Sequence, residues 1–190
     1  MDTKEHVTRD DKYLARIYAS LPVVFEKSEG VWMWDVEGKK YLDFVSAYSA
    51  VSYGHLNPRI KKALLNQLER TDIQARAFRH DRLGEFAEML CKLTGLDQMI
   101  PMNTGAEAVE AGLKTARRWG NMVKKIPDGK QHIIVCKDNF HGRTTTIISF
   151  SSDAEYRRGF GPFDGGFTQI PFGDAAALEK GLGLVRNNYA

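Results

Sequence analysis

Three stretches of the chain carry apolar residues three or four positions apart, which is the spacing that gives a helix one apolar face. They are residues 57–70, 81–95 and 104–120. Asn57 followed by Pro58 is a typical helix start, and Asp81 opens the second stretch. Gly95 and Gly120 stand where the second and third helices should end. The pattern predicts three amphipathic helices, each with an apolar stripe to bury.

Shorter apolar runs predict strands. From Val23 to Val45, apolar and aromatic residues alternate with turn-rich breaks, which favours an antiparallel meander. Residues 99–102, 132–136 and 144–150 are further strand-like runs around the third helix. Helix and strand alternate here, which indicates a parallel-rich sheet covered by helices, with sites at the carboxyl ends of strands. The predicted fold class is α/β, with a mixed, mostly parallel sheet and an N-terminal antiparallel meander.

The start of the third helix is a candidate anion site. Asn103 or Thr104 can cap the helix, Gly105 lets a ligand approach the backbone, and the first-turn N–H groups are free to bind an anion. Glu110 and Lys114 also form a favourable pair four residues apart. A small-residue turn is, however, an ordinary connection in α/β proteins, and this loop lacks the repeated glycines of known nucleotide motifs. Both interpretations are open from these residues alone.

Composition narrows the function classes. With 43% hydrophobic and 27% charged residues, the 190-residue chain is typical of a globular protein. Its formal charge of +3 is small and its basic residues are dispersed, so nucleic acid is not an expected partner. The first residues have no apolar core for a secretory signal, and no run approaches the roughly 18 apolar residues of a membrane span. We expect a soluble, cytoplasmic protein that binds no membrane.

Isolated reactive side chains predict little chemistry by themselves. Cys91 and Cys136 have no Cys or His partner at ligand spacing, so we expect buried thiols and no metal site. Asp35 and Asp43 are typical of turn and strand-end residues. No Ser-His-Asp or Cys-His arrangement follows from order or spacing.

Three segments together resemble a known enzyme family. They are MNTGAEAVEAGLKTARRWG at 102–120, DNFHGRTTTIISFSSD at 138–153 and GFGPF at 159–163. These segments are similar to the class III aminotransferases that use pyridoxal phosphate, and the ornithine-using branch is the one that they resemble most. WDVEGKKYLDFVSAYSAVSYGHLNPRI at 34–60 shares the resemblance, which runs from about Tyr13 to about Lys180.

The resemblance implies the type I fold of pyridoxal-phosphate-dependent transferases. Residues 1–46 would belong to the small domain, and residues 47–190 would form the first part of the large cofactor-binding domain. The family's chains are longer, the likeness stops before their Schiff-base lysine, and the final GLGLVRNNYA departs from the expected continuation. We therefore expect an N-terminal piece with no catalytic residue of its own, in which Lys137 and Lys180 are solvated.

The resemblance also implies cofactor-binding residues. Thr104, Gly105 and Ala106 would hold the phosphate of pyridoxal phosphate, the last two through backbone N–H groups. Phe140 would stack on the pyridine ring, and His141 would touch the cofactor or its phosphate. Without the family likeness, the residue type favours a core aromatic for Phe140, and a structural histidine is an equal alternative for His141.

Substrate residues follow from the same resemblance. Arg143 offers a planar fork for a carboxylate, and the family likeness implies that Arg143 and Tyr18 hold the α-carboxylate and α-amino end of ornithine. Tyr48 matches another tyrosine of the family's substrate pocket. A lone arginine is otherwise a surface or paired charge.

The implied reaction transfers the δ-amino group of ornithine to 2-oxoglutarate, so the partners are an amino acid and a 2-oxo acid. Another ω-aminotransferase, such as one for acetylornithine, and a non-catalytic interaction fragment are the alternatives. Because the family's site lies at a dimer interface, we expect a homodimer or larger assembly with apolar surface exposed on the meander and the first two helices. We expect the isolated chain to be inactive.

Overall fold

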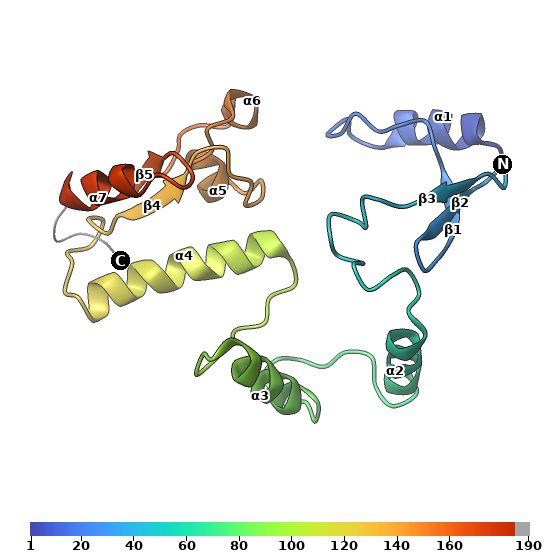
Figure 1. Ribbon diagram of the computed structural model, residues 1–190, viewed down its shortest axis with the longest axis horizontal. Coiled ribbons are helices and arrows are strands. Elements are labelled where there is room, and N and C mark those ends of the chain that lie inside the picture. Colours follow the sequence, from blue (N-terminus) through green and yellow to red (C-terminus); the bar gives the residue numbers. More distant parts are fainter. Residues whose placement is uncertain (185–190) are drawn as a thin grey trace. The chain divides into compact units, whose positions relative to one another are not determined.

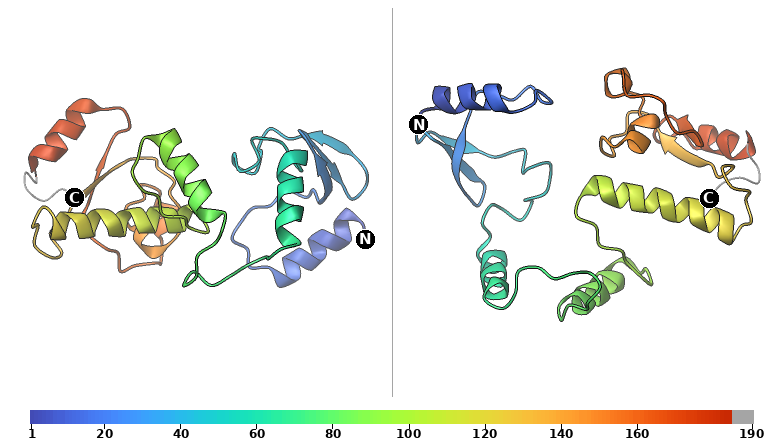
Figure 2. Two further views of the ribbon diagram at one scale, coloured as in Figure 1. Left: turned by 90° about the horizontal axis from the view of Figure 1, so that it is seen from below. Right: turned by 180° about the vertical axis from the view of Figure 1, so that it is seen from behind.

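The computed structural model describes residues 1–184, and the end of the divergent segment, 185–190, lies outside the described residues. The chain divides into two compact units, Met1–Gly84 and a second unit that begins at Glu85. The elements of each unit can be followed in Figures 1 and 2. The assignment of residues 1–46 to a small domain stays a prediction.

The first unit contains the predicted meander. Its elements are α1 (Thr3–Tyr13), β1 (Phe25–Glu29), β2 (Trp32–Asp35), β3 (Lys40–Leu42) and α2 (Pro58–Leu68). The three strands pair antiparallel in the order β1-β2-β3, which confirms the meander (Figure 1). Asn57 caps α2 as predicted. Helix α1 is an addition to the predicted elements and begins at a capping box between Asp2 and Glu5.

A buried carboxylate fixes the turn between β2 and β3. Asp35 accepts hydrogen bonds from the Tyr41 hydroxyl and from the N–H groups of Glu37 and Lys39, at 2.8, 3.0 and 2.8 Å. Burial by itself would raise the pKa of Asp35, but the hydrogen bonds from Tyr41, Lys39 and Glu37 together hold it below its ordinary value. The predicted turn residue is therefore an ionised anchor of the meander.

The second unit is a small α/β layer structure. Its elements are α3 (Leu83–Thr94, which starts just before the division), α4 (Gly105–Met122), β4 (Ile133–Cys136), α5 (Thr145–Ser149), α6 (Ala154–Arg157), β5 (Phe167–Ile170) and α7 (Ala175–Leu184). Strands β4 and β5 pair in parallel, from Ile133 opposite Phe167 to Cys136 opposite Ile170. Ribbon views show α4 and α7 on either side of this sheet (Figure 2). The parallel sheet confirms the predicted fold class.

Alternation along the strands explains the two layers. Val135 packs with Ile147 and Phe150, and α4 contributes Val109 and Leu113 to this cluster. Side chains at neighbouring strand positions point to the other face, where Ile134 and Ile170 lie beside Gly181 of α7. The core of the unit therefore lies between α4, α5 and one face of the sheet.

Several predicted boundaries are wrong. Residues 145–149 form helix α5 instead of a strand, because the Thr144 side chain caps the turn and both isoleucines are buried. Residues 99–102 form no strand, since within the described residues no other strand pairs with them. Helix α3 begins at Leu83 instead of Asp81, whose carboxylate pairs with Arg70 at 2.8 Å.

Helix α4 also continues through Gly120 to Met122, instead of stopping at the glycine. The buried Gly120 lies where the chain folds back, so that its carbonyl accepts a hydrogen bond from Ile126. Glu110 accepts from the Thr144 hydroxyl instead of pairing with Lys114. Gly95, with a φ of +72°, follows the end of α3 as predicted.

The apolar stripes of α2 and α3 have no cover among the described residues. Neither helix contains a buried residue. The large exposed side chains are Ile60, Leu64, Leu65 and Leu68 on α2, and Phe86, Met89 and Leu93 on α3. The periodicity predicted these helices correctly but placed their stripes in a core, whereas the expectation of exposed apolar surface is confirmed.

Candidate functional site

The N-terminus of α4 has the form of an anion site. Thr104 is the N-cap, and its hydroxyl accepts a hydrogen bond from the N–H of Glu107 at 3.1 Å. The Glu107 carboxylate accepts in turn from the N–H of Asn103 at 2.8 Å. The N–H groups of Gly105 and Ala106 have no acceptor among the described residues. Two polarised donors at the positive end of an 18-residue helix are therefore available to an anion.

The loop that follows β4 lies against this first turn. A Cβ atom at Gly142 would stand only 2.8 Å from the Cβ of Ala106, and Gly142 has a φ of +126°. The next residue but one, Thr144, donates its hydroxyl hydrogen bond to the Glu110 carboxylate on α4. The predicted approach of loop 139–143 to the Thr104–Gly105 turn is confirmed.

Phe140 is presented outward by this loop. Its side chain is 62% exposed, and the Tyr156 ring lies edge-on to it, with 6.0 Å between centroids. The alternative of a core aromatic is therefore wrong. The His141 ring is tilted against the buried Phe150, with 5.9 Å between centroids, although His141 as a residue is exposed. Phe140 and His141 thus precede Gly142, the residue of this loop that contacts Ala106 in the first turn of α4.

The predicted substrate residues are distributed over both units. Arg143 is exposed and lies between Gly142 and the capping Thr144, in the same loop as Phe140. Tyr18 and Tyr48 are exposed residues of the first unit. The structure brings Arg143 together with the cofactor candidates, whereas the two tyrosines are placed only within their own unit.

Three residues of this site were absent from the prediction. Gly142 permits the close approach of the loop, and the pair of Glu110 and Thr144 ties the loop to α4. The sequence signal for Gly142 was a glycine standing between His141 and Arg143. Glu110 and Thr144 are 34 positions apart, and a contact at that separation cannot be predicted from helical spacing.

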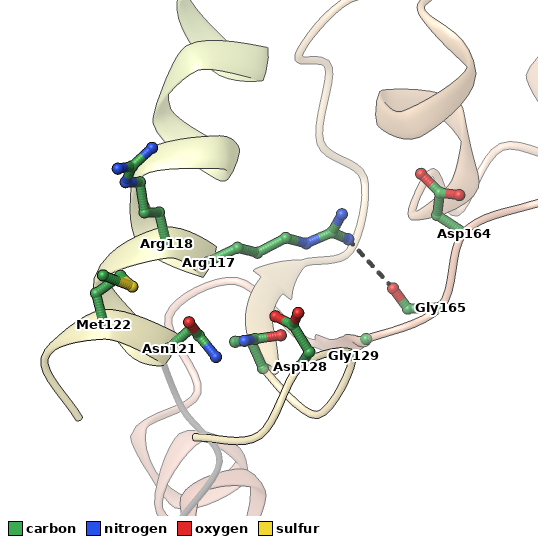
Figure 3. A pocket seen from close by; sticks show the side chains of 10 residues that line it. Arg117, Arg118, Asn121, Met122, Asp128, Gly129, Asp164 and Gly165 are labelled. Atoms are coloured by element: carbon green, nitrogen blue, oxygen red, sulfur yellow. Dashed lines mark hydrogen bonds between the residues drawn. The ribbon is translucent and has the colours of Figure 1, made fainter. Parts of the chain in front are cut away.

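A separate polar cavity lies at the other end of α4 (Figure 3). It encloses about 640 Å³ between the end of the helix, the loop at Asp128 and the chain at Asp164. Arg117 extends across it and donates to the Gly165 carbonyl at 3.3 Å, with its guanidinium 5.2 Å from the centre of the Phe167 ring. At 1.5 Å per residue, Arg117 lies about 20 Å along the helix from Thr104, so this cavity is not the anion site.

Other site types find little support in the described part of the chain. No group of three His, Cys, Asp or Glu side chains there is arranged to hold a metal ion. Both cysteines are free and partly buried. Lys137 and Lys180 are exposed, which confirms their predicted solvation. No helix of the described residues is both long and apolar enough to cross a membrane.

Comparison with known proteins decides the family. The family model described as aminotransferase class-III matches residues 13–183. The chain belongs to the class III aminotransferases. The loop and helix of the site are therefore part of a class III aminotransferase, and the resemblance in the sequence is confirmed.

Class III aminotransferases of known sequence include several similar relatives. The chain is 53% identical to an ornithine aminotransferase from Brevibacillus brevis over 176 residues, which cover 93% of this chain and 44% of the relative. It is 50% identical to the ornithine aminotransferase of Halalkalibacterium halodurans over 180 residues, with 95% and 45% covered. The chain thus spans less than half the length of the curated relatives it matches.

Solved structures agree with the fold. An ornithine aminotransferase from Toxoplasma gondii matches with a TM-score of 0.93 and 38% identity, over 96% of this chain and 43% of that one. An acetylornithine aminotransferase from Elizabethkingia anophelis matches with a TM-score of 0.84 and 47% identity, over 100% and 45%. The architecture is therefore that of part of a class III aminotransferase.

The residues present fit the phosphate end of pyridoxal phosphate, the cofactor of this family. A phosphate dianion needs several donors, and the α4 terminus offers two unengaged N–H groups together with the helix dipole. The close contact between Gly142 and Ala106 brings the loop that carries Phe140 to the first turn of α4. Lys137, directly after β4, and Lys180 are both exposed.

Proposed function

We propose that this chain is the N-terminal part of an ornithine δ-aminotransferase. The enzyme moves the δ-amino group of ornithine to 2-oxoglutarate, which yields glutamate 5-semialdehyde and glutamate. The observation that carries the proposal is the loop Asn139–Arg143 lying on the anion-ready start of α4, in a chain 53% identical to an ornithine aminotransferase. That loop combines a phosphate seat, an aromatic face and a carboxylate-binding side chain.

Each residue has a defined task in this proposal. Gly105 and Ala106 bind the cofactor phosphate through their N–H groups, and the Thr104 cap orients these groups toward it. Phe140 covers the cofactor ring and His141 lies beside the phosphate. When bound, pyridoxal phosphate supplies the aldehyde that accepts the amino group and passes it to the second substrate.

Arg143 recognises the substrate carboxylate. Its guanidinium offers two parallel N–H donors, and both ornithine and 2-oxoglutarate carry a carboxylate to accept them. Tyr18 and Tyr48 contact the α-amino end of ornithine, which leaves the distal amine to react. The hydrogen bond from Thr144 to Glu110 ties the residue after Arg143 to α4.

A second candidate is an acetylornithine aminotransferase. The relative from Elizabethkingia anophelis is 47% identical to this chain, more than the 38% of the Toxoplasma gondii ornithine aminotransferase. The two substrates differ only at the α-amine, which is charged in ornithine and acylated in the alternative. Discrimination therefore depends on the groups that contact the α-amine.

We also propose a homodimer, supported by the uncovered apolar stripes on α2 and α3. Residues from the rest of a longer polypeptide would complete each site. The chain by itself would not turn over ornithine, because an aminotransferase needs a lysine to hold its cofactor covalently.

A hybrid polypeptide tests the function. In it, this chain replaces the matching residues of the Brevibacillus brevis relative, and ornithine or N-acetylornithine is supplied with 2-oxoglutarate. Formation of glutamate 5-semialdehyde from ornithine, with a higher kcat/KM than for N-acetylornithine, is the expected result. Preference for the acetylated substrate would support the second candidate, and no turnover of either by a folded hybrid would reject both.

A further inference from the structure

Tyr48 lies in an unusual backbone turn. Ser46, Ala47, Tyr48 and Ser49 have φ values of 48°, 47°, 56° and 74°. An L-residue with a side chain is disfavoured in this left-handed region, and such residues normally occur singly. A run of four therefore needs other interactions to hold it.

The turn offers little packing of its own to Tyr48. The side chain is 85% exposed. Hydrogen bonds inside the turn run from the N–H of Tyr48 to the Val45 carbonyl, and from the N–H of Val51 to the Ser46 carbonyl, at 2.9 and 3.1 Å. The position of the Tyr48 ring therefore depends on the backbone of this turn.

Asp43 caps the entrance to the turn. One carboxylate oxygen accepts hydrogen bonds from the N–H groups of Val45 and Ser46, both at 2.9 Å. The other oxygen accepts from Nε2 of His55 at 2.7 Å, since an ionised carboxylate can only accept. The hydrogen bond from His55, followed by those from Ser46 and Val45, holds the pKa of Asp43 below its ordinary value. Asp43 thus links Ser46, the first residue of the left-handed turn, to His55, which follows the turn.

The backbones of Asp43 and His55 are also hydrogen-bonded to the turn between β1 and β2. His55 exchanges two backbone hydrogen bonds with Gly30, at 2.7 and 3.0 Å, and the N–H of Asp43 donates to the Val31 carbonyl at 2.9 Å. The side chains of His55 and Asp43 are only 15% and 8% exposed. A largely desolvated charge-assisted hydrogen bond on a rigid hairpin is a strong restraint.

We propose that His55 and Asp43 are positioning residues, which hold the left-handed turn so that Tyr48 is presented to the substrate. This inference rests on the proposed function for the role of Tyr48, but the restraint itself can be measured without any substrate. Neither residue touches the reacting groups in this proposal. Their effect passes through the backbone of residues 45–49.

The test compares His55→Ala with His55→Gln in this chain. Glutamine keeps an N–H donor at similar reach, and His80→Ala removes a histidine from another His–Asp contact of the same unit, at 3.2 Å, as the matched control. Hydrogen exchange read by NMR reports the N–H groups of Val45 and Ser46. We expect His55→Ala to lower their protection about tenfold to a hundredfold, as for loss of a hydrogen bond to a charged group.

Protection of β2 should stay unchanged in His55→Ala, and both His55→Gln and His80→Ala should match the original chain at Val45 and Ser46. Unchanged protection in His55→Ala, or an equal loss throughout the meander, would overturn the inference.

The hybrid enzyme supplies the second readout. There His55→Ala should raise the KM for ornithine about tenfold, with a smaller change in kcat and rescue by His55→Gln. An unchanged KM beside a loosened turn would overturn the role in presenting Tyr48. A hybrid with the original His55 that uses no ornithine would reject the proposed function, and the exchange data would then still decide whether the restraint exists.

Discussion

Helices α4 and α2 both carry apolar residues at three- and four-residue spacing, but only α4 has a partner for its stripe among the described residues. Val109 and Leu113 of α4 pack on Ile147 and Phe150, which are almost fully buried. Leu64, Leu65 and Leu68 of α2 are more than half exposed. Periodicity thus determines that a helix forms, whereas burial depends on elements distant in the sequence.

The comparison also explains where the candidate site lies. The packed face of α4 fixes the helix against β4 and α5, so the free N–H groups at its start have a rigid position beside loop 139–143. Helix α2 provides exposed apolar surface and no such framework. A site that must hold a small cofactor is expected on the packed helix.

The largest expected effect distinguishes the two helices directly. Phe150→Ala should lower the free energy of unfolding of the second unit by about 3–5 kcal/mol, because the side chain is 2% exposed and leaves a cavity. In the monomer, at high dilution, Leu64→Ala, at 58% exposure, should change stability by no more than about 0.5 kcal/mol. Urea denaturation of both variants measures the difference. A comparable loss from Leu64→Ala would mean that the α2 stripe is covered in solution.

Arg143→Ala tests the proposed substrate-binding role of the loop beside α4. In the hybrid enzyme it should lower kcat/KM for ornithine by the equivalent of about 2–4 kcal/mol, as for removal of one partner of a buried ion pair. Arg143→Lys keeps the charge but loses the planar fork, so it should recover only part of the loss. Arg118→Ala, at the far end of α4, is the control. If ornithine use stayed intact while the cofactor dissociated, Arg143 would belong to the phosphate site.

Gly142→Ala tests the contact between loop and helix. The new Cβ would lie 2.8 Å from that of Ala106 at a φ of +126°, so we expect a loss of about 2–3 kcal/mol. Gly159→Ala has a φ of +80° and no atom within 4 Å of the new Cβ, and should cost only about 1 kcal/mol. Thermal unfolding compares the two. Equal losses would show that backbone conformation alone, without the steric contact, matters at Gly142.

The smallest expected effect is a difference in acid sensitivity between the two units. Within the described residues, the lowered carboxyl pKa values belong to Asp35, Asp43 and Asp81, all in Met1–Gly84. A carboxyl whose pKa is lower in the folded state stabilises it fully above its unfolded value, and this stabilisation is lost as the pH falls through the folded value. The first unit should therefore lose amide protection first as the pH falls below the ordinary value of 3.8. Earlier loss in the second unit would contradict this.

The sequence predicted the elements whose signals are local. The Asn57–Pro58 helix start, the glycine stop at Gly95 and the meander were correct because caps, stops and turn-rich breaks act within a few residues. Residues 145–149 were assigned wrongly because a short apolar β-branched run suits either a buried strand or a buried helix. The cap at Thr144 and burial against α4 favour the helix.

The site was predictable in part for the same reason. Thr104 and Gly105 could be identified as an anion-ready helix start from residue types alone. The Glu110–Thr144 hydrogen bond depends on how the loop after β4 returns to α4. The roles of Phe140, Arg143 and the tyrosines rest on the family resemblance and stay predictions.

The proposed function depends most on cofactor phosphate binding at the start of α4. The direct measurement follows the NMR amide signals of Gly105 and Ala106 during titration with pyridoxal phosphate, and with pyridoxal as a matched control that shares the aldehyde but lacks the phosphate. We predict saturable shifts of both amides with pyridoxal phosphate only. Equal shifts with pyridoxal, or phosphate-dependent shifts confined to the cavity at Arg117, would contradict the claim.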